Sequence, residues 1–158
     1  MAGLGRRMRV DLLKYVANAT PAGSPTNIFV GFSTAAPADD ASTVAEPTIS
    51  TGGYTRAQMG SGGVAWTAVA TPAAGAPARL LNSGPVTWGG TTQGSASTAA
   101  WSSGTTPLAY LAYWTAATGV TEATFVAFGA VSTPPQVNAA GVTLTAATSA
   151  LEINIDDT

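Results

Sequence analysis

The sequence predicts an all-β fold: a β-sandwich or jelly-roll-like domain with a short N-terminal helix and long loops rich in Gly, Ser, Thr and Ala. Two observations predict this class. About seven or eight short β-branched and aromatic runs alternate with Gly and Pro turns, and one helical pattern precedes them. With 158 residues, 46% of them hydrophobic, the chain can bury one core without disulfides or metal. We expect an N-terminal basic helical arm over residues 1–22 and a single β-sandwich domain over residues 23–158.

The helical pattern comes first. Spacings of four, four and three residues place one set of side chains on a single helix face: Leu4, Met8, Leu12 and Tyr15. Pro21 ends the pattern. Two interpretations remain open, a helix that caps the sandwich core and an arm that reaches a neighbouring subunit.

The middle of the chain contains short strands between long loops. Residues 27–33 are an apolar run bounded by turn formers, as in a buried strand. Further strands are predicted at 54–60, 64–70 and 85–88, and no strand is predicted at 35–53, 71–84 or 89–106. Trp101 lies in the last of these segments, where an aromatic anchor finds a pocket in its own core or in a partner. We predict that Trp101 contacts a partner.

The last third has the clearest strand patterns. Residues 108–115 alternate with apolar side chains on both faces, which predicts a central strand. Strands follow at 124–131 and 142–145. The final strand, 150–156, has one apolar face and one polar face, as in a strand that is wet on one side.

The charges are unevenly distributed. Residues 1–14 carry four cations against one carboxylate, a balance of +3, and the remainder carries two cations against seven carboxylates, a balance of −5. A basic arm on an acidic body suggests docking onto an acidic neighbour, although the arginines could also simply solvate one helix face. The arm residues predicted to bind the capsid or a neighbouring subunit are Arg6, Arg7, Met8, Arg9 and Leu12.

The composition disfavours most enzymatic classes. There is no His and no Cys, so the usual nucleophilic triads are unavailable. The adjacent carboxylates Asp39 and Asp40 do not flank a cleft as glycosidase acids do, and a calcium site there lacks the spaced ligand pattern. We therefore predict no catalytic residue, cofactor, metal or small-molecule substrate. No basic patch interleaved with aromatics predicts nucleic-acid binding, and no run approaches the ~20 apolar residues of a membrane span.

Two arginines differ from those of the arm. Arg56 and Arg79 are the only cations of the β body, so each is expected to pair with a carboxylate or with backbone carbonyls. We interpret Arg56, next to Tyr54 in a predicted strand, as structural rather than ligand-binding.

Several short motifs occur in a characteristic order. They are Ser33-Thr34-Ala35-Ala36-Pro37 before an acidic loop, Glu46, Gly52-Gly53-Tyr54-Thr55-Arg56, Ala116-Ala117-Thr118-Gly119 and Val137-Asn138-Ala139-Ala140-Gly141. In this order the chain resembles a family of small tailed-bacteriophage virion proteins, known as minor tail, tail-fibre, capsid decoration or minor capsid proteins. Two features depart from that pattern: Thr115 stands where the family tends to have Asp, and residues 71–106 form a longer stretch.

The resemblance implies a structural role in a phage particle, without catalytic residues, for a protein made in the host bacterial cytoplasm. We expect a capsid decoration or minor capsid protein on the capsid surface of the virion, which binds the major capsid protein and forms a homo-oligomer. The alternative is a minor tail or tail-fibre protein that contacts the host surface, where exposed Trp88, Trp101 or Tyr residues would bind host carbohydrate. A third class is an enzyme such as a cell-wall hydrolase.

Overall fold

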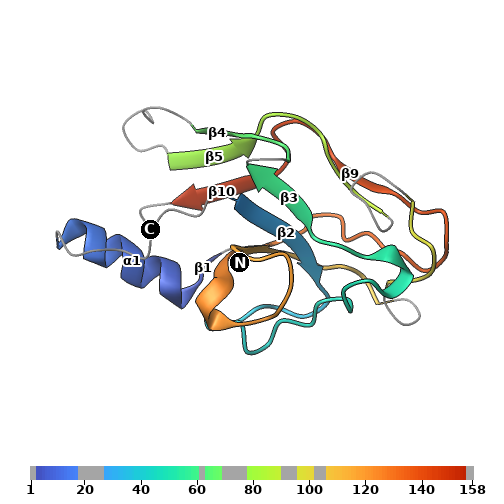
Figure 1. The fold of residues 1–158 in the computed structure, drawn as a ribbon, viewed down its shortest axis with the longest axis horizontal. Helices are drawn as coiled ribbons and strands as arrows, with labels where there is room; N and C mark the ends of the chain where they lie inside the picture. The colour runs from blue at the N-terminus through green and yellow to red at the C-terminus, as the bar shows by residue number, and fades with distance from the viewer. Residues whose placement is uncertain are drawn as a thin grey trace.

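The computed structural model describes residues 3–17, 27–60, 63–68, 78–89, 96–101 and 106–155. These residues form mostly antiparallel β-strands with a single α-helix, which confirms the predicted all-β class (Figure 1). The elements are β1 (Gly3–Leu4), α1 (Arg6–Val16), β2 (Asn27–Ser33), the 3-10 turn η1 (Thr51–Gly53), β3 (Ala57–Gly60), β4 (Trp66–Ala68), β5 (Ala78–Asn82), β6 (Val86–Trp88), β7 (Tyr110–Trp114), η2 (Glu122–Thr124), β8 (Phe125–Ala130), β9 (Leu144–Ala146) and β10 (Glu152–Ile155).

The described strands form three sheets. The largest has five strands in the order β1-β8-β7-β2-β3, the second has the order β10-β5-β4, and the third pairs β6 with β9. Every pairing between these strands is antiparallel. The pattern of residues 108–115 correctly predicted the central strand, because β7 lies in the middle of the largest sheet.

The main core lies between one face of the large sheet and the two smaller sheets. Apolar side chains of β2, β3 and β7 meet those of β6 and of the segment that enters β10; the fully buried ones include Val30, Met59, Val86 and Leu108. A second cluster covers the opposite face and contains Ala41, Ala112, Trp114 and Phe125. Strand β7 is thus buried on both faces, as alternating apolar side chains predict.

Strand β5 was not predicted from the sequence. Residues 71–84 are rich in Ala, Pro and Gly, yet Ala78–Asn82 pairs with β4 on one side and with β10 on the other. Its partner in β10 is distant in the sequence, with Leu80 opposite Ile153, so the local composition carries no sign of the pairing. The buried Asn82 strengthens the link, because its Oδ1 accepts a hydrogen bond from the Leu151 N–H at 2.8 Å.

The described part of the N-terminal arm is attached to the large sheet. Gly3 and Leu4 pair with Phe128 and Ala127 of β8, and the Gly5 N–H donates to the Val126 carbonyl at 2.6 Å. Helix α1 begins at the next residue and lies at one end of the molecule's long axis, whereas β9 lies toward the other (Figure 1). The boundary predicted at residue 22 falls outside the described residues.

Candidate functional site

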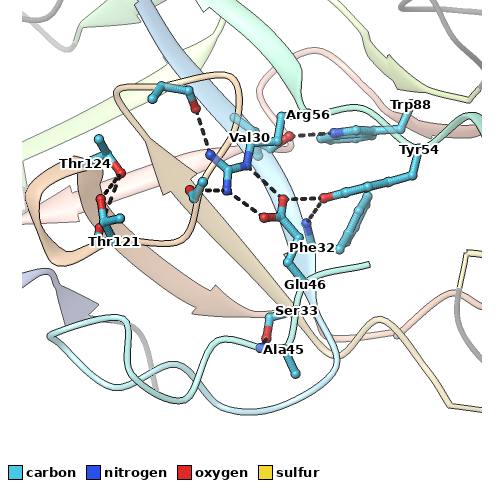
Figure 2. A network of polar contacts seen from close by, with 12 residues as sticks. Val30, Phe32, Ser33, Ala45, Glu46, Tyr54, Arg56, Trp88, Thr121 and Thr124 are labelled. Carbon is cyan, nitrogen blue, oxygen red and sulfur yellow. Dashed lines mark hydrogen bonds and ion pairs between the residues drawn. The ribbon is translucent and has the colours of Figure 1, made fainter. Parts of the chain in front are cut away.

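A buried ion pair is the most elaborate polar feature of the described protein. The Arg56 guanidinium donates to both carboxylate oxygens of Glu46, with Nε–Oε1 at 2.8 Å and Nη2–Oε2 at 2.6 Å (Figure 2). The Arg56 side chain is 0% exposed and that of Glu46 is 4% exposed. This two-pronged geometry is the strong form of a charge-assisted hydrogen bond, and it confirms that Arg56 pairs with a carboxylate.

The same guanidinium also binds a distant turn. Its Nη1 donates to the Ala116 carbonyl at 2.7 Å and its Nη2 to the Gly119 carbonyl at 2.8 Å. The guanidinium carbon lies 4.2 Å from the centroid of the Trp114 ring, a cation–π geometry. Arg56 therefore connects the segment around Glu46 with β7 and with the turn that follows β7.

Tyr54 completes this network. Its hydroxyl donates to Glu46 Oε1 at 2.8 Å and accepts the Phe32 N–H at 2.9 Å (Figure 2). Burial raises the pKa of Tyr54 well above its ordinary value of 10.0, and the negative charge of Glu46 raises it further. The hydroxyl consequently keeps its proton near neutral pH and acts as a donor to the carboxylate.

Gly31 of β2 leaves room for these side chains. A Cβ atom at this position would lie 2.6 Å from Glu46 Oε1 and 2.6 Å from the Tyr54 hydroxyl. Neither atom is the free end of a mobile side chain, since both take part in hydrogen bonds. Glycine is required at position 31 because the Glu46 and Tyr54 oxygen atoms occupy the space that a Cβ atom would need.

Three of the motifs that carry the family resemblance meet in this network. They contribute Glu46, the pair Tyr54 and Arg56, and the carbonyls of Ala116 and Gly119. The short motifs therefore hold three segments of the chain together. The sequence indicated that Arg56 has a structural role, but its spacing did not identify Glu46 as the partner.

The basic arm pairs with acidic residues of its own chain. Arg6 lies 3.9 Å from Asp40 and 3.5 Å from Glu122, and Arg9 forms an ion pair with Asp39. Hydrogen bonds from Ser42 hold the pKa of Asp40 below its ordinary 3.8, and Arg6 adds to this effect. An acidic neighbour of the arm is thus present within the protein.

The other predicted arm residues differ in their surroundings. Met8 is half-buried and packs against the main core, which matches a helix that caps the core. Leu12 is exposed, and the side chain of Arg7 lies outside the described set. Exposure increases toward the end of α1, where Leu13 is 67% and Val16 is 77% exposed. Binding of a partner by the predicted residues stays a prediction.

Trp101 occupies the protein's own core, one of the two positions that the sequence left open. Its side chain is 4% exposed, its Nε1–H donates to the Gly52 carbonyl at 3.1 Å, and its ring meets Tyr54 edge-on at 5.1 Å. Trp88 is buried as well and donates to the Val30 carbonyl at 2.8 Å. The expectation that these two rings are exposed is wrong, because core packing buries both.

A polar pocket of about 290 Å³ opens beside Glu46 and Trp101. Its remaining walls come from the loop after β2 and from the residues that lead toward β7: Thr34, Ala45, Pro47, Thr48 and Thr106. The sequence did not predict this pocket, because its walls come from three separate segments of the chain. A Thr-rich composition alone does not show which threonine hydroxyls lie together in the folded protein.

The described ranges contain no group of three or more His, Cys, Asp or Glu side chains arranged for a metal ion. Among them there is also no helix with the length and apolar character needed to cross a membrane.

Together, the antiparallel sheets and the buried network define a β-rich protein whose most elaborate polar contacts join its own segments. Residues 6–154 match the family model described as podophage GP4 fiber I protein gp80. The chain therefore belongs to this family and is a structural component of a bacteriophage particle. A comparison with curated proteins found no match.

Proposed function

We propose that this protein is a fibre subunit of a podophage particle and contributes to contact with the host surface. The observation that carries the proposal is the family match, which names a fibre protein and spans residues 6–154. Arg56 supports a structural role, because its guanidinium pairs with Glu46 and also binds the distant carbonyls of Ala116 and Gly119.

The predicted capsid decoration role depends on a basic arm that binds acidic capsid subunits. Arg6 and Arg9 already face Asp39, Asp40 and Glu122 of the same chain, which reduces the charge available to such a partner. The exposed apolar end of α1, with Leu13 and Val16, instead suits attachment to another virion subunit or to a second copy of the chain. We propose that α1 attaches the protein to its neighbour in the particle, whether the protein lies in a fibre or on the capsid.

Immunogold electron microscopy of purified particles tests the proposal, with antibody raised against this chain. Gold confined to the fibres or tail is the expected result. Gold spread evenly over the heads would overturn the fibre role and favour capsid decoration. As a second measurement, the purified protein should bind host cells and compete with phage adsorption, and a failure to compete would contradict host contact.

A further inference from the structure

A second pocket, of about 270 Å³, opens beside β9 and is apolar. The buried rings of Phe32 and Trp88 lie at its base, with their centroids 4.9 Å apart. The indole N–H of Trp88 is already bonded to the Val30 carbonyl, so the base offers a ligand only apolar ring surface. The residues that line this apolar pocket include no charged side chain, which suits an aliphatic group.

The walls of the apolar pocket are half-buried side chains on backbone that is held in place. The Val131 N–H donates to the Ala109 carbonyl at 2.9 Å, and the Pro135 carbonyl accepts the Leu108 N–H at 2.8 Å. Leu144 belongs to the β6–β9 pair. The side chains of Val131, Pro135 and Leu144 each keep part of their surface open at the pocket. A ligand would therefore meet a preformed site and would not have to order it.

The apolar end of α1 is the opposite kind of feature, a projection. Of the exposed large apolar side chains in the described ranges, all but Val120 lie on α1, and Leu13 and Val16 are the most exposed at 67% and 77%. These two residues are three positions apart, so they share one face of the helix. An exposed apolar group of this kind marks a contact with another molecule.

The helix and the apolar pocket are too far apart to meet within one chain. Strand β1 ties the start of α1 to β8, and the helix packs against β8 and η2. It lies at one end of the long axis, whereas β9, which lines the pocket, lies toward the other (Figure 1). The same chain thus carries an apolar projection and an apolar pocket that a second copy can bring together.

Charge favours insertion of the helix into the pocket over the pairing of two helices. Residues 1–14 carry four cations against one carboxylate, so two N-terminal arms side by side would bring like charges together. Lys14, next to Leu13, is itself 46% exposed. The rest of the chain carries two cations against seven carboxylates, and no cation is among the residues that line the apolar pocket. The body of a second copy is therefore the electrostatically favoured partner of the helix.

We propose that Leu13 and Val16 of one copy insert into the apolar pocket of the next, so that the protein assembles head to tail. This inference rests on the proposed attachment role of α1 and identifies its partner as a second copy. A cavity of about 150 Å³ holds benzene, so about 270 Å³ has room for a leucine side chain and part of a neighbouring valine. Each added copy leaves one helix and one pocket free, which extends a row of subunits or closes a ring.

Sedimentation velocity of the purified full chain tests for this association. The contact is small and weak on its own, so the mean size of the oligomers should increase with protein concentration. Two variants each remove one side of the contact: Leu13→Lys places a charge on the exposed helix face, and Thr133→Arg places one at the exposed rim of the pocket. Each should weaken association about tenfold or more with an unchanged Tm, because the burial of one leucine side chain corresponds to at least that factor.

A mixture of the two variants identifies the geometry. The Leu13→Lys chain keeps its pocket and the Thr133→Arg chain keeps its helix, so mixing them should give a two-chain complex and nothing larger. In the ¹⁵N-labelled Leu13→Lys chain, nuclear magnetic resonance should show a shift of the Trp88 indole N–H when the unlabelled Thr133→Arg chain is added. The indole N–H of Trp101, which is bonded to Gly52, should stay in place.

Thr98→Arg, at an exposed position outside the apolar pocket, is the matched control and should assemble as the wild type does. The proposal is overturned if the wild type stays monomeric up to its solubility limit, if the control loses association equally, or if the mixed variants remain monomers. It is also overturned if Thr133→Arg still associates alone while Leu13→Lys does not, because that result assigns the contact to paired helices.

This result is separable from the proposed function. Protein that labels fibres and competes with adsorption, but stays monomeric in solution and in the variant mixture, would retain the fibre role and lose the head-to-tail contact. Gold on the heads together with a two-chain complex of the mixed variants would reject the fibre role and retain the contact.

Discussion

Arg56 and Glu46 form a two-pronged ion pair in the interior, with the Arg56 Nη2 atom 2.6 Å from Glu46 Oε2. Removing two charges from water costs several kcal/mol per ion, so such a pair is stable only when its other hydrogen-bonding groups are also satisfied. Here the carbonyls of Ala116 and Gly119 satisfy further guanidinium donors, and Tyr54 donates to the carboxylate. The pair therefore fixes three segments in one arrangement.

Replacing Arg56 with Met should lower the free energy of unfolding by about 3–5 kcal/mol, because Glu46 is left as an unpaired buried charge. Urea unfolding followed by circular dichroism measures the change. Arg9→Met is the matched control, and because Arg9 is 52% exposed its loss should cost at most about 1 kcal/mol. Equal losses in the two variants would contradict the importance of the buried pair.

Substituting Gly31 with Ala should destabilise the protein by about 1–3 kcal/mol, because the added Cβ overlaps Glu46 Oε1 and the Tyr54 hydroxyl. Gly84→Ala provides a control, since a Cβ there meets only Val64 Cγ1 at an ordinary 3.7 Å. Thermal unfolding of both variants measures this difference in stability. A similar Tm for the two would show that the network can move aside.

The stability of the protein should decrease as the pH rises above 10. Tyr54 has a raised pKa in the folded state, so its contribution is complete below the unfolded value of 10.0 and is lost as the pH rises toward the folded value. Urea unfolding between pH 8 and pH 11 measures this slope. Tyr54→Phe should show a shallower slope, and an unchanged slope would assign the effect to other groups.

The contact of α1 with the body should weaken in acid. Hydrogen bonds from Ser42 and, to a smaller extent, the charge of Arg6 in α1 lower the pKa of Asp40 in the folded protein, so the part of its stabilisation that comes from Arg6 is complete above its ordinary value of 3.8 and is lost as the pH falls below it. Hydrogen exchange of the α1 amides should accelerate in that range, relative to the intrinsic rate, before the β7 amides lose protection. Asp40→Asn should reduce this dependence, and simultaneous exchange of both elements would argue against local release.

Local sequence patterns predicted the strands whose formation depends on the residues of the strand itself. Residues 27–33 form β2 at the predicted positions, and the two apolar faces of 108–115 correctly indicated a central strand. Strand β5 escaped prediction because it depends on pairing with β10, which no local window contains.

The candidate site could likewise be predicted from the sequence only in part. The scarcity of cations in the β body indicated that Arg56 is paired, whereas the identity of Glu46 as partner depends on how loops meet in three dimensions. The arm charges suggested an acidic partner, but composition does not distinguish a partner on another molecule from Asp39 on the same chain. Likewise, the burial of Trp101 follows from its contact with Tyr54, which is remote in the sequence.

The pairing of Gly3 with Phe128 has a consequence for synthesis. During translation, β1 and α1 leave the ribosome long before β8 exists, so they have no sheet to join until residue 128 has been made. Folds dominated by such distant pairings form slowly, and their apolar segments are exposed to other chains meanwhile. We expect the positive charge of Arg6, Arg7 and Arg9 to repel the same segment of neighbouring nascent chains during this interval, before the helix has docked.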